Sequence, residues 1–158
     1  LMKELGLPEA PAQKLAEKVW DIGEFIHANF AALEPLLNPV RHRLQVTYHS
    51  TCHLRNHGRG KALIEDLLQR LPSVDYCRAP DWDACCGGGG LFFNEYRAIA
   101  KRMVDAKIRN AAATGSRTWA TGCPGCRVQL AGHLPRRGTL AVCHPLEVVS
   151  QALRPRGA

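Results

Sequence analysis

A run of β-forming residues reads Leu44-Gln45-Val46-Thr47-Tyr48-His49, and a helical pattern over residues 61–71 follows it. Valine, threonine and tyrosine are enriched in strands. In the second stretch leucines recur three and four residues apart, which indicates one apolar face of a helix. Further strand and helix patterns alternate with similar spacing towards the end of the chain. This alternation predicts an α/β domain with a mostly parallel, doubly wound sheet of about four strands and flanking helices.

The remaining elements are predicted by the same two patterns. We expect strands at residues 74–77, 117–121 and 140–143, and helices at 94–113, 124–134 and 145–153. In the helix 94–113 the apolar residues expected to point inward are Ile99, Met103, Ala106 and Ile108. Upstream, a helical pattern over 9–34 predicts a lead-in helix. We therefore divide the chain into a helical lead-in and linker, residues 1–43, and a cysteine-rich domain, residues 44–158.

Length and composition restrict the class of protein. The chain has 158 residues, of which 46% are hydrophobic and 22% charged, which fits one folded domain and excludes disorder. A run of about 18 apolar residues is missing, so we expect no membrane span. We see no signal peptide and expect a cytoplasmic location, with membrane association only through partners. From the start at Leu1-Met2-Lys3, which lacks an initiator methionine, we expect a piece of a longer polypeptide.

The net charge of +7 raises the question of a nucleic-acid partner. The basic residues are scattered and are not interleaved with aromatic side chains, so we expect no nucleic-acid binding. An anionic cofactor explains the same charge. Near such a centre, Arg55, His57, Arg59 and Arg127 would supply positive charge, and His53 and His57 could donate hydrogen bonds to sulfur.

Seven cysteines carry the chemical information. Their number is odd and no secretion signal is visible, so metal ligands or redox groups are favoured over disulfides. Five of them follow predicted strands, at Cys52, at Cys85-Cys86 and at Cys123 with Cys126. Loops after parallel strands leave the same edge of a sheet, and we expect the five sulfurs to converge there. The other two, Cys77 and Cys143, fall within predicted strands and are expected to be packing residues.

The local sequence around these cysteines is typical of metal ligands. Cys123-Pro124-Gly125-Cys126 directs two thiolates to the same side of the chain. Adjacent cysteines, as at Cys85-Cys86, are poorly placed for a relaxed disulfide but can reach different metal atoms. The run Gly87–Gly90 lets backbone N–H groups approach sulfur. Helices that begin near Leu91 and Pro124 would direct their positive ends to the thiolates.

The histidines other than His53 and His57 are less informative. We expect the following to be structural or solvated: His27, His42, His49 and His133. His144 precedes Pro145 at the end of a predicted strand, near the same edge of the sheet, and either a structural or a functional role is open for it.

The pattern Cys52-x32-Cys85-Cys86-x36-Cys123-x2-Cys126 resembles that of the cysteine-rich CCG domain. This family includes the active-site subunit of heterodisulfide reductase and the iron–sulfur subunits of glycolate and lactate oxidases. The resemblance implies that these five cysteines bind a [4Fe–4S] cluster, which is non-cubane in some members, or zinc in some copies. It further implies electron transfer within an oxidoreductase complex, with a flavoprotein or another redox subunit as partner and an upstream domain.

Three alternatives stay open at this point. The chain could be an active-site domain of the heterodisulfide reductase type, or a structural zinc-binding domain. It could also be a thiol–disulfide oxidoreductase that uses Cys123 and Cys126, although this leaves Cys52 and the Cys85-Cys86 pair unused. Over these three alternatives we favour a domain of the glycolate or lactate oxidase type. We expect such a domain to be inactive without its partners.

Overall fold

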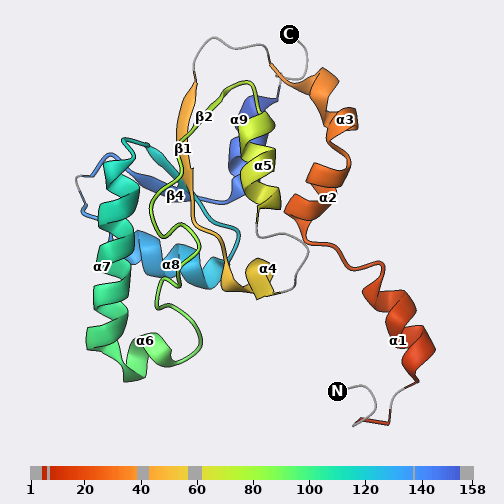
Figure 1. Ribbon diagram of the computed structural model, residues 1–158, viewed down its shortest axis with the longest axis horizontal. Coiled ribbons are helices and arrows are strands. Elements are labelled where there is room, and N and C mark those ends of the chain that lie inside the picture. Colours follow the sequence, from red (N-terminus) through yellow and green to blue (C-terminus); the bar gives the residue numbers. More distant parts are fainter. Residues whose placement is uncertain (1–4, 7, 39–42, 57–61, 137, 154–158) are drawn as a thin grey trace.

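The structure is a computed structural model, and it describes residues 5–6, 8–38, 43–56, 62–136 and 138–153. Its centre is a four-stranded sheet in which every pair of neighbouring strands is parallel (Figure 1). The strands are β1 (Leu44–Tyr48), β2 (Val74–Tyr76), β3 (Thr118–Ala120) and β4 (Ala141–Cys143), and their spatial order is β2-β1-β3-β4. This confirms the predicted parallel α/β sheet.

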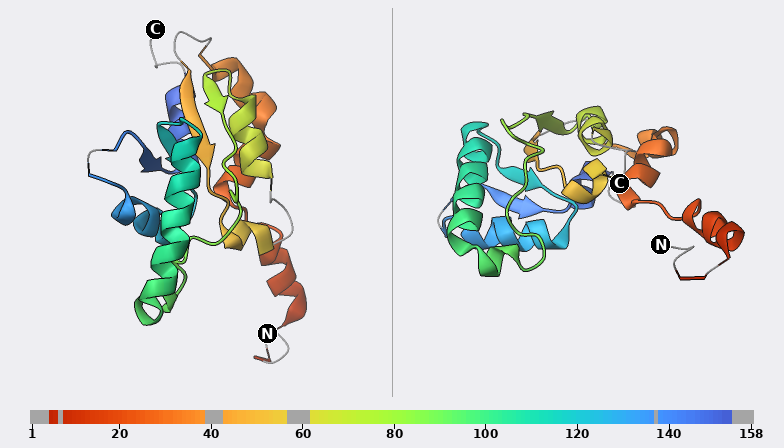
Figure 2. Two further views of the ribbon diagram at one scale, coloured as in Figure 1. Left: turned by 60° about the vertical axis from the view of Figure 1, so that its left-hand side comes forward. Right: turned by 60° about the horizontal axis from the view of Figure 1, so that its bottom comes forward.

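Helices connect the strands and cover both faces of the sheet (Figures 1 and 2). They are α4 (Cys52–Asn56), α5 (Leu63–Arg70), α6 (Phe92–Glu95), α7 (Arg97–Ala113), α8 (Pro124–His133) and α9 (Pro145–Ala152). Leucines of α5 and valines of α9 pack with Val46, Tyr48 and Ala120 on one face. On the other face, Val104 of α7 and Leu130 of α8 pack on Trp119. The sheet is therefore doubly wound, as predicted.

The lead-in is not the single helix that we expected over 9–34. It consists of α1 (Glu9–Ala16), α2 (Ile22–Ala28), α3 (Phe30–Leu33) and a 3₁₀ turn, η1 (Glu34–Leu36). The break has a local cause, because the Asp21 carboxylate accepts a hydrogen bond from the Gly23 N–H at 2.8 Å and so caps the start of α2. α2 packs on α5, whereas α1 projects from the body in each view (Figures 1 and 2) and buries no residue.

The predicted helix over 94–113 is also divided. Tyr96, with φ −116° and ψ 49°, separates α6 from α7. The fully buried residues of α7 are Ala100, Val104, Lys107 and Ala111. Of the residues expected to point inward, Met103 and Ala106 are half-buried, and Ile108 is half-buried and packs against the core. Ile99, expected to point inward, is exposed. A lysine therefore occupies a core position of this helix.

The dimensions and polarity of the helices bear on membrane association. In the part of the chain that the structure describes, no helix combines the length and the apolar character that a membrane span requires.

Candidate metal centre

The cysteine loops meet where the direction of winding reverses, between β1 and β3. The connection from β1 to β2 passes through α5 on one face, and the connections from β2 to β3 and from β3 to β4 use α7 and α8 on the other. Ligands of open α/β sheets bind at such a switch point, outside the carboxyl ends of the strands. Cys52 and Cys123 begin the segments that follow β1 and β3. The long connection after β2 carries the Cys85-Cys86 pair.

Three buried side chains form a compact donor group at this edge. The ligand atoms of His49, Cys86 and Cys126 lie within 4.8 Å of one another, and all three residues are buried. The His49 backbone N–H donates to the Ala120 carbonyl at 2.9 Å, and its ring packs edge-on against Trp119. Among the described residues, the His49 Nδ1 atom finds no hydrogen-bond partner. Such an unsatisfied buried nitrogen, next to two thiols, is suited to binding a metal or a cluster.

A glycine turn holds the Cys85-Cys86 pair between two helices. The Gly87 N–H donates to Cys85 Sγ at 3.3 Å. Gly87 has φ +78°, and a Cβ there would lie 3.1 Å from the backbone of Ala100 in α7. A Cβ on Gly88 would lie 2.8 Å from the Gln129 Cβ in α8. Only a chain without side chains at these two positions can pass so close to both helices, which explains part of the glycine run.

The two buried thiols, Cys86 and Cys126, shift each other's pKa in opposite directions. A hydrogen bond from the Cys126 thiol, and a weaker contribution from His49, hold the pKa of Cys86 far below its usual range. The same hydrogen bond to Cys86, together with burial, raises the pKa of Cys126. The lowered pKa of Cys86 favours the thiolate, which is the form of cysteine that binds metals.

The other three predicted ligands lie around this group with different exposure. Cys123 is half-buried and packs against the cluster that contains Cys86 and Cys126. Cys52 is exposed at the first residue of α4, an element not foreseen from the sequence, and Cys85 is exposed in the glycine turn. The structure thus brings Cys86, Cys123 and Cys126 together, and it places Cys52 and Cys85 on connections from the same edge of the sheet.

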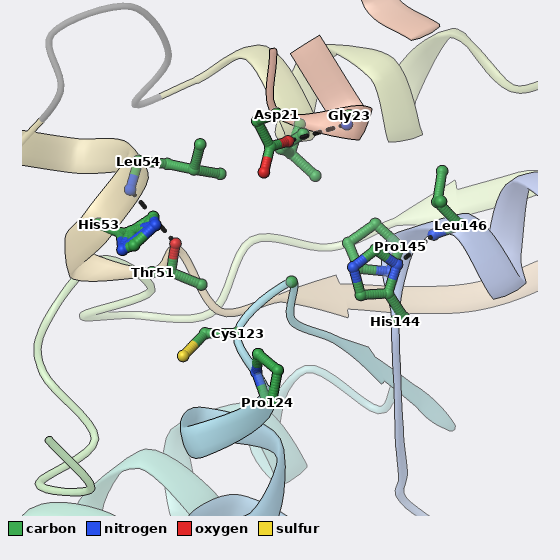
Figure 3. Close-up of a pocket in the computed structure, with 12 residues that line it drawn as sticks. Asp21, Gly23, Thr51, His53, Leu54, Cys123, Pro124, His144, Pro145 and Leu146 are labelled. Atoms are coloured by element: carbon green, nitrogen blue, oxygen red, sulfur yellow. Dashed lines mark hydrogen bonds between the residues drawn. The ribbon is translucent and has the colours of Figure 1, made fainter. Parts of the chain in front are cut away.

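A pocket of about 110 Å³ adjoins Cys123. Figure 3 shows the rings of His53 and His144 on opposite sides of it, with Thr51 and the Cys123 sulfur between them. His144 has a structural role here, because its Nδ1 accepts from the Leu146 N–H at 3.2 Å and caps α9. His53 is exposed on α4 and lines the pocket.

Two of the charged residues expected near the centre, Arg55 and Arg127, are described by the structure, and each contacts a different group. Arg55 donates to the Asp83 carbonyl and so fastens the cysteine loop. Arg127 pairs with Glu147 at 2.9 Å, and both side chains are nearly half exposed. His57 and Arg59, like His42 among the other histidines, lie outside the described residues.

Two predictions about single residues need correction, and a third is confirmed. Cys77 is exposed directly after β2 and is not a packing residue in a strand, because β2 ends at Tyr76. His49, which we expected to be merely structural or solvated, is part of the buried donor group. The alternation along β1 places His49 on the face of the sheet opposite to Val46 and Tyr48, but only the fold brings the thiols of two other segments to it. Cys143 does lie in β4 and is half-buried.

A parallel α/β domain with thiols and an imidazole gathered at its switch point defines a class of metal- or cluster-binding domains. The family model described as a cysteine-rich domain, CCG, matches residues 46–131. This match covers more than half of the chain, and the chain therefore belongs to the cysteine-rich CCG domain family.

The chain is also similar to several curated proteins named lactate utilization protein A. It is 27% identical over 158 residues to the protein of Halalkalibacterium halodurans, covering 99% of this chain and 63% of that protein. For Lysinibacillus sphaericus the identity is 31%, with 88% and 60% covered, and for Bacillus subtilis 29%, with 88% and 58%. The chain thus spans about three fifths of these relatives. Family and relatives together support an oxidoreductase-associated domain of the iron–sulfur type.

Proposed function

We propose that this chain is an iron–sulfur, electron-transfer domain of an oxidoreductase that acts on a small 2-hydroxy acid. The observation that carries the proposal is the buried group of two thiols and an unsatisfied imidazole nitrogen at the switch point of the sheet. The proposed ligands are Cys52, Cys85, Cys86, Cys123 and Cys126. Four thiolates complete a cubane [4Fe–4S] site, so the fifth favours an opened, non-cubane cluster.

The chain's own residues contribute binding and electrostatics. The lowered pKa of Cys86 favours its thiolate form, and the Gly87 N–H donates to the Cys85 sulfur. Helix α8 begins at the Cys123–Cys126 turn, where its positive end favours anionic sulfur. Trp119 and Leu130 exclude water from the inner side of the group. The cluster, when bound, supplies one-electron chemistry.

The names and lengths of the relatives support a proposal about the partners of this domain. The name of the relatives refers to lactate utilization, and they are longer than this chain. We propose that a further domain of the same polypeptide and a flavoprotein or other redox subunit complete the reaction, and that the complex lies in the cytoplasm. The flavoprotein would oxidise the substrate, and this domain would pass the electrons on.

The cofactor is tested by analysis of protein purified and reconstituted without oxygen. We expect a brown protein that contains several irons and sulfides per chain, because five thiolates at one edge suffice for a cluster. A colourless protein that takes up neither iron nor zinc would contradict the proposal.

A zinc-binding structural domain is the second candidate, because the compact nitrogen and sulfur group of His49, Cys86 and Cys126 also suits tetrahedral zinc. The same analysis separates the two candidates. One tightly bound zinc per chain, with no iron uptake under reconstitution, would establish zinc and exclude the cluster.

His49 is expected to contribute to metal binding in either case. We expect His49→Leu to weaken the affinity for Co²⁺, measured by chelator competition, by about 10–100-fold, the usual effect of losing a group that supports a metal site. His133→Leu is the control, because His133 lies at the far end of α8 and its Nδ1 contacts the Gln129 carbonyl at 2.9 Å. Equal affinities of the two variants would contradict a role for His49.

A thiol–disulfide oxidoreductase based on Cys123 and Cys126 is less well supported. Such an enzyme would use only the two cysteines of the Cys-x-x-Cys motif. Here Cys126 lies within 4.8 Å of Cys86 and His49 from two other segments, and a dithiol enzyme leaves both of these residues without a role.

The isolated chain is expected to lack substrate turnover. We see no flavin- or nicotinamide-binding motif in the sequence, so the purified chain should not oxidise lactate or glycolate with an artificial electron acceptor. The assay is dye reduction, and addition of the proposed flavoprotein partner is the positive control. Turnover by the chain alone would contradict the role of an electron carrier.

A further inference from the structure

A lysine lies buried next to the metal centre. Lys107 is one of the fully buried residues of α7, and its side chain is only 3% exposed. Its ammonium donates to the Asp81 carbonyl at 2.5 Å and lies 3.7 Å from the Asp81 carboxylate. Lysine is almost never buried without a partner, because desolvation of its charge is costly. An apolar side chain would fill this core position without the cost of burying a charge. The buried ammonium of Lys107 therefore points to an electrostatic role.

The contact point of Lys107 is the turn that leads to the cysteine pair. Asp81 has φ 53°, the left-handed conformation that residues other than glycine rarely adopt. Its carbonyl also accepts from the Ala84 N–H at 2.7 Å, which closes the turn directly before Cys85 and Cys86. Lys107 thus ties α7 to the segment that carries the two adjacent thiols.

The charge of Lys107 also acts on the centre itself. Through the Asp81 carbonyl, the ammonium is fixed to the turn that ends directly before Cys85 and Cys86, so it lies on the segment whose thiols would carry the negative charge of a cluster. Burial lowers the pKa of Lys107, and the negative charge of Asp81 opposes this shift. Interactions of this kind are weakly screened by solvent when the groups are buried.

We propose that Lys107 is a positioning residue of the metal centre, which anchors the turn at Asp81 and supplies a fixed positive charge that raises the reduction potential of the bound cluster. This inference rests on the proposed cluster-binding function. When the cluster takes up one electron from the partner subunit, its charge becomes more negative by one and no proton is needed. A buried ammonium stabilises the reduced form more than the oxidised form, which raises the potential.

The test compares midpoint potentials of reconstituted full-length chains in anaerobic redox titrations followed by electron paramagnetic resonance. Lys107→Met is expected to shift the potential to a more negative value. Lys101→Met is the matched control, because Lys101 is on the same helix but 65% exposed and paired with Asp105. It removes the same formal charge and is expected to leave the potential unchanged.

A second variant covers the case in which Lys107→Met does not fold. Asp81→Asn keeps a residue that tolerates the left-handed conformation and removes the carboxylate, so that the lysine charge is less compensated. We expect its potential to shift to a more positive value. If Asp81→Asn keeps the wild-type potential, and Lys107→Met does so as well where it folds, the inference about Lys107 is wrong. The proposed cluster-binding function would not be affected by that result. A wild-type chain that binds no iron would instead refute the proposed function, and the inference with it.

Discussion

Cys86→Ser is expected to remove most of the iron from the reconstituted protein and to abolish its brown colour. Cys86 belongs to the buried donor group, and its lowered pKa favours the thiolate that a metal binds. Serine keeps the size of the side chain but offers a hydroxyl, which is a poor ligand for iron and zinc at neutral pH. The measurement is iron and sulfide content per chain, with the absorption spectrum.

The controls for this prediction are two other cysteines of the same chain. Cys77 is exposed after β2, and Cys143 lies half-buried in β4. We expect Cys77→Ser and Cys143→Ala to keep full iron content. If Cys86→Ser keeps its iron and an unchanged paramagnetic spectrum, four other ligands suffice, and the five-cysteine cluster is wrong.

Variants of Cys52 and Cys85 distinguish a bound cluster from a single bound metal ion. Cys52 and Cys85 stand outside the compact group and are exposed. A mononuclear zinc site at His49, Cys86 and Cys126 does not require Cys52 or Cys85 as a ligand. An opened cluster with five cysteine ligands requires both. Loss of iron in Cys52→Ser and Cys85→Ser thus supports the cluster specifically.

The sheet and the place of the site could be predicted from the sequence because both depend on local patterns. Each strand lies within one or two residues of its predicted position, as β1 and β4 show. Once the strands are parallel, the loops that follow them must leave one edge, so the meeting of the cysteine segments follows from topology alone. No side-chain detail is needed for that step.

The parts that could not be predicted depend on tertiary packing. The apolar pattern of α7 predicted Ile99 and Met103 as inward residues. The buried residues instead include Ala100, Val104 and Lys107, and an apolar pattern does not predict a lysine at a core position. That position is explained only by Asp81, 26 residues away in the chain. His49 was misjudged for a similar reason, since its role depends on thiols from two other segments.

The second large effect is expected at the glycine turn. Gly87→Ala should lower the free energy of unfolding of the metal-free protein by about 3 kcal/mol, measured by urea denaturation. The left-handed backbone at φ +78° costs an alanine about 1–2 kcal/mol. Its Cβ would also lie 3.1 Å from the Cα and carbonyl oxygen of Ala100, and crowding of this kind typically costs about 1–3 kcal/mol.

Gly89→Ala is the matched control, two residues further along the same glycine run. A Cβ at Gly89 meets no described atom within 4 Å, and its φ is not left-handed. We therefore expect Gly89→Ala to unfold at the wild-type urea concentration. Because the backbone at Gly87 also fixes the direction of the adjacent Cys86, only Gly87→Ala should reduce iron uptake in reconstitution. Equal stability and equal iron content of both variants would mean that the turn is not held against α7, and that something other than this packing aligns Cys86 with Cys126.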